Sequence, residues 1–451
     1  MTNVFSKPKV NRRIEIRNIF NTFFKNQSNG GIVLLSCAIL AIIIANVTQL
    51  NFLDNIWDQK FGFFIGTGKI EMTLKHWIND GLMAIFFFVV GLEIKREMLA
   101  GELSSLKQAS LPIIAAIGGM ALPALIYSIF NYGSDSQNGW GIPMATDIAF
   151  ALGILSLLGK RIPVSLKIFL TALAIVDDLG AIVVIALFYP AHAIQPELLI
   201  YSGGIILLLI LFNRLNIHNA FFYVIPGILL WFFILGSGIH ATIAGVLLAM
   251  TIPGRTSINE VRFYVHCKFL LDKFKAAGNH EVMVLANPAQ QQIIQSMHNN
   301  LKSINPLMYR LERSLNPWVT FLIMPVFALA NAGVEFNSTL FSAPFPPISE
   351  GIFAGLLLGK PFGIFFASWI ACKLKIAKLP AGVKWSQIFS LGIIAGIGFT
   401  MSIFIDNLAF TDSTLVDTGK VTILITSFVA AVFGLIAIYV STKSNIKNQT
   451  N

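Results

Sequence analysis

The chain has 451 residues, of which 55% are hydrophobic and only 12% are charged, and its formal net charge is +10. A soluble domain carries roughly 25% charged residues, so the composition excludes a soluble globular protein and indicates a membrane protein. The three cysteines are too few and too scattered for a disulfide framework or a zinc site.

About twelve apolar segments follow one another along the chain, each long enough to cross a bilayer as a helix. They lie near 30–49, 77–98, 109–131, 139–158, 164–189, 197–213, 219–235, 239–252, 316–333, 351–371, 387–409 and 420–441. We therefore predict an all-α polytopic membrane protein surrounded by the lipid bilayer. Its transmembrane domain covers 30–442, between a cytoplasmic N-terminal segment at 1–29 and a cytoplasmic tail at 443–451.

The basic residues indicate the orientation of these spans. Most of the 32 Lys and Arg residues fall in connections on one side of the predicted zigzag. The exceptions are Lys60, Lys69, Lys75 and Lys420 on the opposite side, and Lys360 inside a span. Under the positive-inside rule both termini are cytoplasmic. Because topology accounts for the positive charge, the sequence predicts no nucleic-acid partner.

Two connections are longer than the others. Residues 58–75 alternate apolar and polar side chains on both sides of "GTG", which predicts a periplasmic β-hairpin. An isolated hairpin is marginally stable, so we expect it to pair with a second copy in a homodimer; a loop lying on the membrane surface is the alternative. Residues 254–306 are predicted to be an extended cytoplasmic loop, partly helical within 287–305.

Four ionisable residues lie deep in predicted spans: Asp147 in the fourth, Asp177 and Asp178 in the fifth, and Lys360 in the tenth. Their uncompensated insertion would cost on the order of 10–14 kcal/mol, so we expect them to meet inside the bundle. One acid with Lys360 would form a structural ion pair, but the remaining acids need protons or a metal cation. Asp406, toward the outer end of the eleventh span, is interpreted as a solvated acid.

Glycine and proline interrupt the fourth and eleventh spans, which read "GWGIPMATDIAFALG" and "LGIIAGIGFTMSIF". Such interruptions in both halves of a transporter indicate two discontinuous helices that cross at the binding site. Asp147 would then balance the positive helix ends and Lys360 the negative ends. For "GIIAGIG" alone, close helix packing through small residues is the alternative.

These motifs resemble the NhaA family of bacterial sodium/proton antiporters over almost the whole chain. The similar blocks are "INDGLMAIFFFVVGLEIKRE", "PIIAAIGGMALPA", "ATDIAFALGILSLLGKR", "ALAIVDDLGAIVVIALFY", "SGIHATIAGV", "FALANAGV", "GLLLGKPFGI" and "GIGFTMSIFI". The resemblance implies inverted repeats, a location in the bacterial inner membrane, and no enzymatic activity or cofactor. It also implies electrogenic, pH-regulated exchange of cytoplasmic sodium or lithium for external protons.

The resemblance assigns roles to individual residues. Asp178 is the main ion ligand, with Asp177 and Thr146 in the same sodium or lithium site. Asp177 pairs with Lys360, and Asp147 balances the helix ends, so Asp177, Asp178, Lys360 and Asp147 share proton exchange and charge compensation. The pH-sensing residues are Glu93, Arg96, Glu97 and Glu312.

The adjacent acids also suggest a mechanism. Neighbouring positions on a helix point about 100° apart, so Asp178 can face the ion while Asp177 faces Lys360. Burial disfavours the charged form of each group, which makes protons and sodium competitors for the same carboxylate. Two alternatives are a passive cation channel, which needs rings of acids or carbonyls, and an intramembrane aspartyl protease, whose acid pair Lys360 would disrupt.

Overall fold

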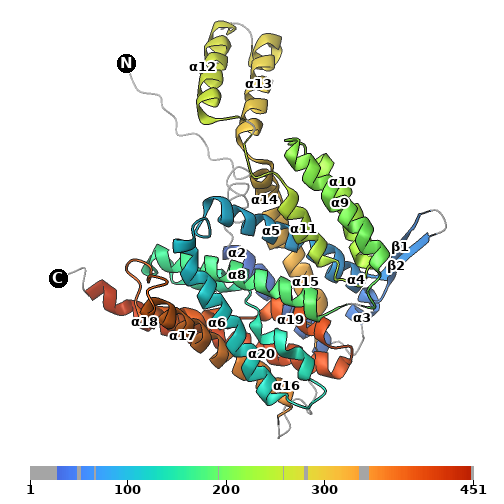
Figure 1. Ribbon diagram of the computed structural model, residues 1–451, viewed down its shortest axis with the longest axis vertical. Helices are drawn as coiled ribbons and strands as arrows, with labels where there is room; N and C mark the ends of the chain where they lie inside the picture. The colour runs from blue at the N-terminus through green and yellow to red at the C-terminus, as the bar shows by residue number, and fades with distance from the viewer. Residues whose placement is uncertain are drawn as a thin grey trace, which may run out of the picture. The chain divides into compact units, whose positions relative to one another are not determined.

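The computed structural model describes residues 28–47, 52–65, 68–190, 192–256, 258–278, 283–334 and 345–447, most of them in helices (Figure 1). The chain divides into two compact units. Unit 1 consists of Met1–Met83, Ser105–Tyr189 and Pro317–Asn451, and unit 2 of Ala84–Ser104 and Pro190–Asn316.

Unit 1 contains long apolar helices together with two pairs of shorter ones. The long helices are α2 (Ser28–Val47), α6 (Leu106–Phe130), α8 (Val164–Phe188), α17 (Lys360–Lys373) and α20 (Ser413–Lys447). Shorter elements are α3 (Phe52–Trp57), α4 (Leu74–His76), η3 (Gly159–Arg161), α15 (Met324–Asn331) and α16 (Pro347–Ala354). Each long helix is apolar because its outer surface contacts lipid; Phe428 on α20, for instance, is 69% exposed.

The two pairs of shorter helices are the discontinuous spans. The 3₁₀ helix η2 (Gln137–Met144) is followed by α7 (Ile148–Leu157) with a bend of 40°. Helix α18 (Trp385–Ala395) is followed by α19 (Phe399–Ala409) with a bend of 49°. Each pair lies in sequence between two continuous spans, and the predicted topology places six spans between the fourth and the eleventh, so the two pairs run in opposite directions. This is the arrangement of an inverted repeat.

Three spans contain a turn of π-helix. These turns are η1 (Trp77–Leu82), η5 (Val319–Ile323) and η7 (Gly355–Gly359), and η7 leads directly into Lys360 at the start of α17. A π turn contains one residue more per hydrogen-bonded ring than an α turn, and such turns are frequent at functional sites. Here it sets the direction in which Lys360 points.

The β-hairpin prediction is confirmed. Strand β1 (Lys60–Ile65) pairs antiparallel with β2 (Gly68–Thr73), with Lys60 opposite Thr73 and Phe63 opposite Ile70. The indole nitrogen of Trp77 donates a hydrogen bond to the Phe61 carbonyl oxygen at 2.9 Å, which connects the hairpin to the start of the second span.

Unit 2 has a compact apolar core and a separate pair of helices. The core is formed by α9 (Pro196–Arg214), α10 (Phe221–Gly236), α11 (Thr242–Thr251), most of α5 (Met83–Ala100) and the start of α14 (Leu307–Trp318). In the long connection, α12 (Glu260–Ala276) and α13 (Pro288–Ile304) pack against each other around the short turn η4 (Val284–Ala286). Helix α13 confirms the prediction for 287–305, whereas α12 was not predicted.

The fold class is therefore confirmed as an all-α polytopic membrane protein with a small β-hairpin. Within the described ranges, eight helices are long and apolar enough to cross a membrane, or up to ten if each bent pair is one span. Two shorter apolar helices, α10 and α11, occupy the seventh and eighth predicted spans. The N-terminal segment 1–29 lies almost entirely outside the described residues, as do 448–451 of the C-terminal tail.

Candidate functional site: a crossing of two broken helices

The two discontinuous spans of unit 1 meet at their breaks. The backbone N–H of Asp147 donates to the carbonyl oxygen of Ile397 at 2.8 Å. The Thr146 hydroxyl donates to the carbonyl oxygen of Ala395, the last residue of α18, at 2.9 Å. Each break thus provides hydrogen-bond partners for polar backbone groups of the other break. Lipid has no groups that could take this role. The crossing places four helix ends in the interior of the unit.

Asp147 caps two of these ends at once. Its Oδ1 accepts a hydrogen bond from the Phe150 N–H at 2.9 Å, at the start of α7. Its Oδ2 accepts from the Thr400 N–H at 3.3 Å, at the start of α19, and also from the Thr400 hydroxyl. Helix N-termini carry partial positive charge, so the single carboxylate stabilises both. The side chain of Asp147 is buried, as the resemblance implied.

Lys360 supplies the opposite charge. Its ammonium donates to the Asp177 Oδ2 at 2.5 Å and to the carbonyl oxygen of Met144, where η2 ends. Lys360 is completely buried. A buried ammonium needs both a negative partner and further hydrogen-bond acceptors, and the acid and the helix C-terminus provide them.

Asp177 and Asp178 lie side by side on α8, and both are buried, with 1% and 2% of their surface exposed. Asp177 makes the ion pair with Lys360, and the Thr146 hydroxyl is its neighbour. The charge of Asp178 also acts on Lys360. The structure therefore brings the predicted ion and proton residues together in unit 1: Thr146, Asp147, Asp177, Asp178 and Lys360.

The residues expected to sense pH gather in unit 2. Arg96 forms ion pairs with Glu312 and, at 3.1 Å, with Glu97. Glu93 accepts a hydrogen bond from the side-chain amide of Asn316 at 3.2 Å. Three acids thus share one arginine, an arrangement whose net charge changes with protonation. The contact to Asn316 was not predicted from the sequence.

Thr400 and Asp406 are two further residues that the sequence reasoning missed or misread. Thr400, the second residue of α19, was assigned no role. The interpretation of Asp406 as a solvated acid is wrong, because its side chain is 0% exposed. It is buried because α20 approaches it closely at Gly419, which the position along the span could not reveal.

Sodium would be cargo here, held by carboxylate and hydroxyl oxygens. Within the described ranges, no group of three or more His, Cys, Asp or Glu side chains can hold a metal ion. Asp178 lies on α8 next to Asp177, whose carboxylate pairs with Lys360.

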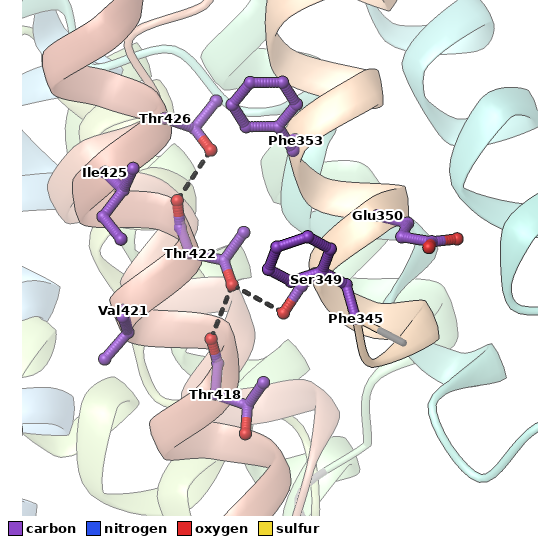
Figure 2. Close-up of a pocket in the computed structure, with 9 residues that line it drawn as sticks. All are labelled: Phe345, Ser349, Glu350, Phe353, Thr418, Val421, Thr422, Ile425 and Thr426. Carbon is purple, nitrogen blue, oxygen red and sulfur yellow. Dashed lines mark hydrogen bonds between the residues drawn. The ribbon is translucent and has the colours of Figure 1, made fainter. Parts of the chain in front are cut away.

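A separate cavity of about 380 Å³ lies between α16 and α20 (Figure 2). Its polar groups are hydroxyls, among them Thr422, which donates to Ser349 Oγ at 2.9 Å and to the Thr418 carbonyl oxygen. The carboxylate of Glu350 points away from the space in Figure 2. With mostly apolar walls and hydroxyls already bonded, this cavity does not fit a cation.

Known proteins resemble this chain along almost its whole length. A family model described as Na+/H+ antiporter 1 matches residues 21–438. A Na(+)/H(+) antiporter NhaA of Wolinella succinogenes is 46% identical over 419 residues, covering 93% of this chain and 92% of the relative. Those of Oleidesulfovibrio alaskensis (48% identical, 92% of each chain) and Acidithiobacillus ferrooxidans (46%, covering 93% and 97%) are similarly close.

Proposed function

Since the chain belongs to the Na+/H+ antiporter 1 family, we propose that it moves cytoplasmic sodium or lithium out of the cell in exchange for external protons. It is a multi-pass membrane transporter and not an enzyme, and it uses no cofactor. The direction, the charge moved per cycle and the residues responsible form our proposal. We place the protein in the bacterial inner membrane with both termini in the cytoplasm, as the distribution of basic residues suggests.

The observation that carries the proposal is the buried ion pair of Lys360 and Asp177 beside Asp178. We assign the ion to Asp178, with Asp177 and Thr146 as neighbouring oxygen ligands. A dehydrated sodium ion needs carboxylate or other hard oxygens, and protonation of Asp178 removes its charge. Sodium binding therefore requires release of a proton, and proton binding requires release of sodium.

Lys360 extends this competition to a second proton. When sodium neutralises part of the negative charge on the two acids, the buried ammonium loses attraction to Asp177 and its proton becomes easier to release. Exchange of one proton at Asp178 and one at Lys360 for one monovalent ion moves net charge. The membrane potential then contributes about 2.3 kcal/mol per charge for each 100 mV.

The crossing explains how the site can alternate between the two sides. Asp147 and Lys360 hold the ends of both broken helices through polar contacts rather than through continuous backbone. The half-helices can then shift relative to neighbouring spans without exposing unpaired backbone groups to lipid. We propose that this shift opens Asp178 to one side of the membrane at a time.

We further propose that Glu93, Arg96, Glu97 and Glu312 regulate transport by pH, because three acids around one arginine change net charge as protons bind.

We also propose a homodimer formed through the 58–75 hairpin on the periplasmic side. A two-stranded hairpin is marginally stable by itself, and pairing with the hairpin of a second copy would stabilise it.

Purified protein in liposomes that contain a pH-sensitive dye tests the exchange. Addition of external sodium should drive protons out of the lumen and raise the internal pH, and lithium should do the same. Sodium entry without proton movement would instead indicate a channel. Absence of both fluxes from well-folded protein would reject transport and reopen the aspartyl protease alternative.

A further inference from the structure

Asp406 is a buried acid that the mechanism above does not use. It lies in the C-terminal half of α19, is 0% exposed, and neither of its carboxylate oxygens has a hydrogen-bond partner. Burial of a carboxyl group without hydrogen bonds is strongly unfavourable. Ionisable residues kept at such cost inside membrane proteins are functional candidates.

Helix α20 brings two further charged groups to this acid. The carboxylate points at Gly419, where a Cβ atom would lie 2.2 Å from Oδ1, so only glycine permits this approach. The next residue, Lys420, is 3% exposed, and its charge acts on Asp406. The Lys420 ammonium lies 3.9 Å from the carboxylate of Asp417, whose side chain is 53% exposed. The three ionisable groups thus lead from the protein interior to its surface.

The other elements packed against Asp406 add one titratable group. Tyr127 on α6 is close enough for its charge to act on the acid. Its hydroxyl, however, donates to the Ser136 carbonyl oxygen at 2.8 Å, so it is committed to a structural bond. Lys420 and Asp417 are therefore the groups that can exchange protons with Asp406.

Helix α19 also joins Asp406 to the helix crossing. Ser402 lies one turn before Asp406 on the same helix face, and its hydroxyl donates to the Ile142 carbonyl oxygen of η2 at 2.8 Å. Near the start of the helix, Thr400 holds Asp147, and the Phe399 N–H donates to Ser427 Oγ on α20 at 3.0 Å. A shift of the crossing would therefore change the distance between Asp406 and α20.

We propose that Asp406 is a further proton-exchanging residue, and that Asp417, Lys420 and Asp406 form the outer end of the proton route. This inference rests on the proposed function. The Lys420 ammonium gives one proton to the Asp406 carboxylate, which leaves both groups neutral. A proton from water on the outer side then passes by way of the Asp417 carboxylate to the Lys420 amine. The Asp406 carboxyl releases its proton toward the crossing, where the Asp178 carboxylate accepts it once sodium has left, and Asp406 becomes charged again.

The alternative is that Asp406 only helps to hold α19 on α20. In that case its removal would lower stability, because Lys420 would remain buried without its acid. If Asp406 instead serves proton transfer, its replacement by a neutral residue also lowers the rate of transport per amount of folded protein. The transport rate of the folded protein therefore separates the two interpretations.

Asp406→Asn and Lys420→Gln test the proposal in everted membrane vesicles, where the outer side of the protein faces the lumen. Sodium-driven proton efflux is measured as a function of luminal pH, per amount of folded protein. We expect each variant to be slower by about tenfold at alkaline luminal pH, with less loss at acidic luminal pH, because a lost proton acceptor limits the rate most when protons are scarce. The KM for sodium should stay unchanged, and Asp406→Glu should restore part of the rate.

The matched control is Asp412→Asn. Asp412 is a fully exposed acid between α19 and α20, where hydrogen bonds from Thr414 hold the pKa of its carboxyl below the usual value. This variant should behave like wild type at every luminal pH. If wild-type vesicles exchange sodium for protons but Asp406→Asn transports within about twofold of wild type at all pH values, the inference is overturned. A lower thermal midpoint with an unchanged rate per folded protein would overturn it too, whereas failure of wild type itself would reject the proposed function.

Discussion

Thr400 reaches Asp147 across the crossing, although the two residues are 253 positions apart in the chain. The backbone N–H and the hydroxyl of Thr400 both donate to one oxygen of the buried acid. This contact fixes the start of α19 against the break of the fourth span. The Thr400 hydroxyl is thus one of the groups that hold the crossing together.

Replacement of Thr400 by valine should therefore weaken the crossing. Valine keeps the shape but removes one donor to a buried carboxylate, which costs about 1–3 kcal/mol. We expect a lower thermal midpoint in detergent and slower exchange in liposomes. Thr400→Ser keeps the hydroxyl and should retain most of both properties. The control is Thr418→Val on α20, a half-buried threonine whose hydroxyl donates only to the Thr414 carbonyl oxygen of its own helix. A Thr400→Val protein as stable as wild type would show that the hydroxyl contributes nothing.

Asp178→Asn should abolish exchange while leaving the amount of protein in the membrane nearly normal. Asparagine preserves the shape of the side chain but can neither release a proton nor offer sodium a negative charge. Loss of an essential proton-transfer group lowers rates by at least about a hundredfold. The measurement is sodium-driven proton flux at saturating sodium, with the exposed Asp135→Asn as control. Retention of more than about a tenth of the wild-type rate would contradict the assignment of the ion to Asp178.

Lys360→Ala should change the electrical behaviour of transport. If Lys360 carries one of the protons, its removal leaves one proton exchanged for each sodium ion, and no net charge moves. We expect surviving exchange to become insensitive to a membrane potential clamped with potassium and valinomycin. The variant should also be less stable by about 3–5 kcal/mol, because Asp177 and the Met144 carbonyl oxygen lose their partner.

The control for this variant is Lys373→Ala, an exposed lysine at the end of the same helix, whose ammonium lies over the Trp369 ring. It should exchange sodium electrogenically, as wild type does. Should Lys360→Ala still respond to the clamped potential like the wild-type protein, Lys360 would be a structural ion-pair partner and not a proton carrier.

Deletion of residues 60–72 should weaken dimerisation and spare sodium-driven exchange. The strands are linked to the second span through the hydrogen bond between Trp77 and Phe61, and the buried acids lie on other elements. The oligomeric state in detergent and the transport rate in liposomes are the two measurements. Loss of exchange by a well-inserted monomer would show that the hairpin has a role in transport itself.

The buried cluster of ionisable residues in unit 1 could be predicted largely from the sequence, for a physical reason. A charged residue in an apolar span is so unfavourable that its presence indicates a functional role. Asp147, Asp177, Asp178 and Lys360 could be identified on that ground alone. The breaks in the fourth and eleventh spans were visible because glycine, together with proline in the fourth span, interrupts hydrophobic segments at comparable places of the two halves. The pairing of particular residues came from the resemblance.

The features that could not be predicted from the sequence depend on contacts between segments that are distant along the chain. Thr400 was overlooked because hydroxyl side chains occur in many spans and usually bond to their own helix, so nothing local distinguished it. The burial of Asp406 depends on the approach of Gly419, thirteen residues later on another helix. Neither contact has a signature in the local sequence.

Helix α12 was not predicted, although the sequence contains a helix-start residue and side chains at helical spacing. Asn259 caps it through the Arg262 N–H at 2.9 Å, and the side chains turned toward α13 recur at helical spacing. These are Phe263, Cys267, Leu270 and Phe274. Basic and apolar residues are mixed on its exposed surface. The helix therefore has no purely polar face, and the apolar face formed by these four residues is hard to recognise in the sequence.

The turn of π-helix at Gly355–Gly359 holds one residue more than an α-helical turn. If this turn changed to α-helical hydrogen bonding with no residue lost, Lys360 would rotate by about 100° relative to the helix before it. Its ammonium would then leave Asp177 although no side chain of the site had changed. The backbone hydrogen bonds of a single turn therefore decide whether the buried ion pair forms.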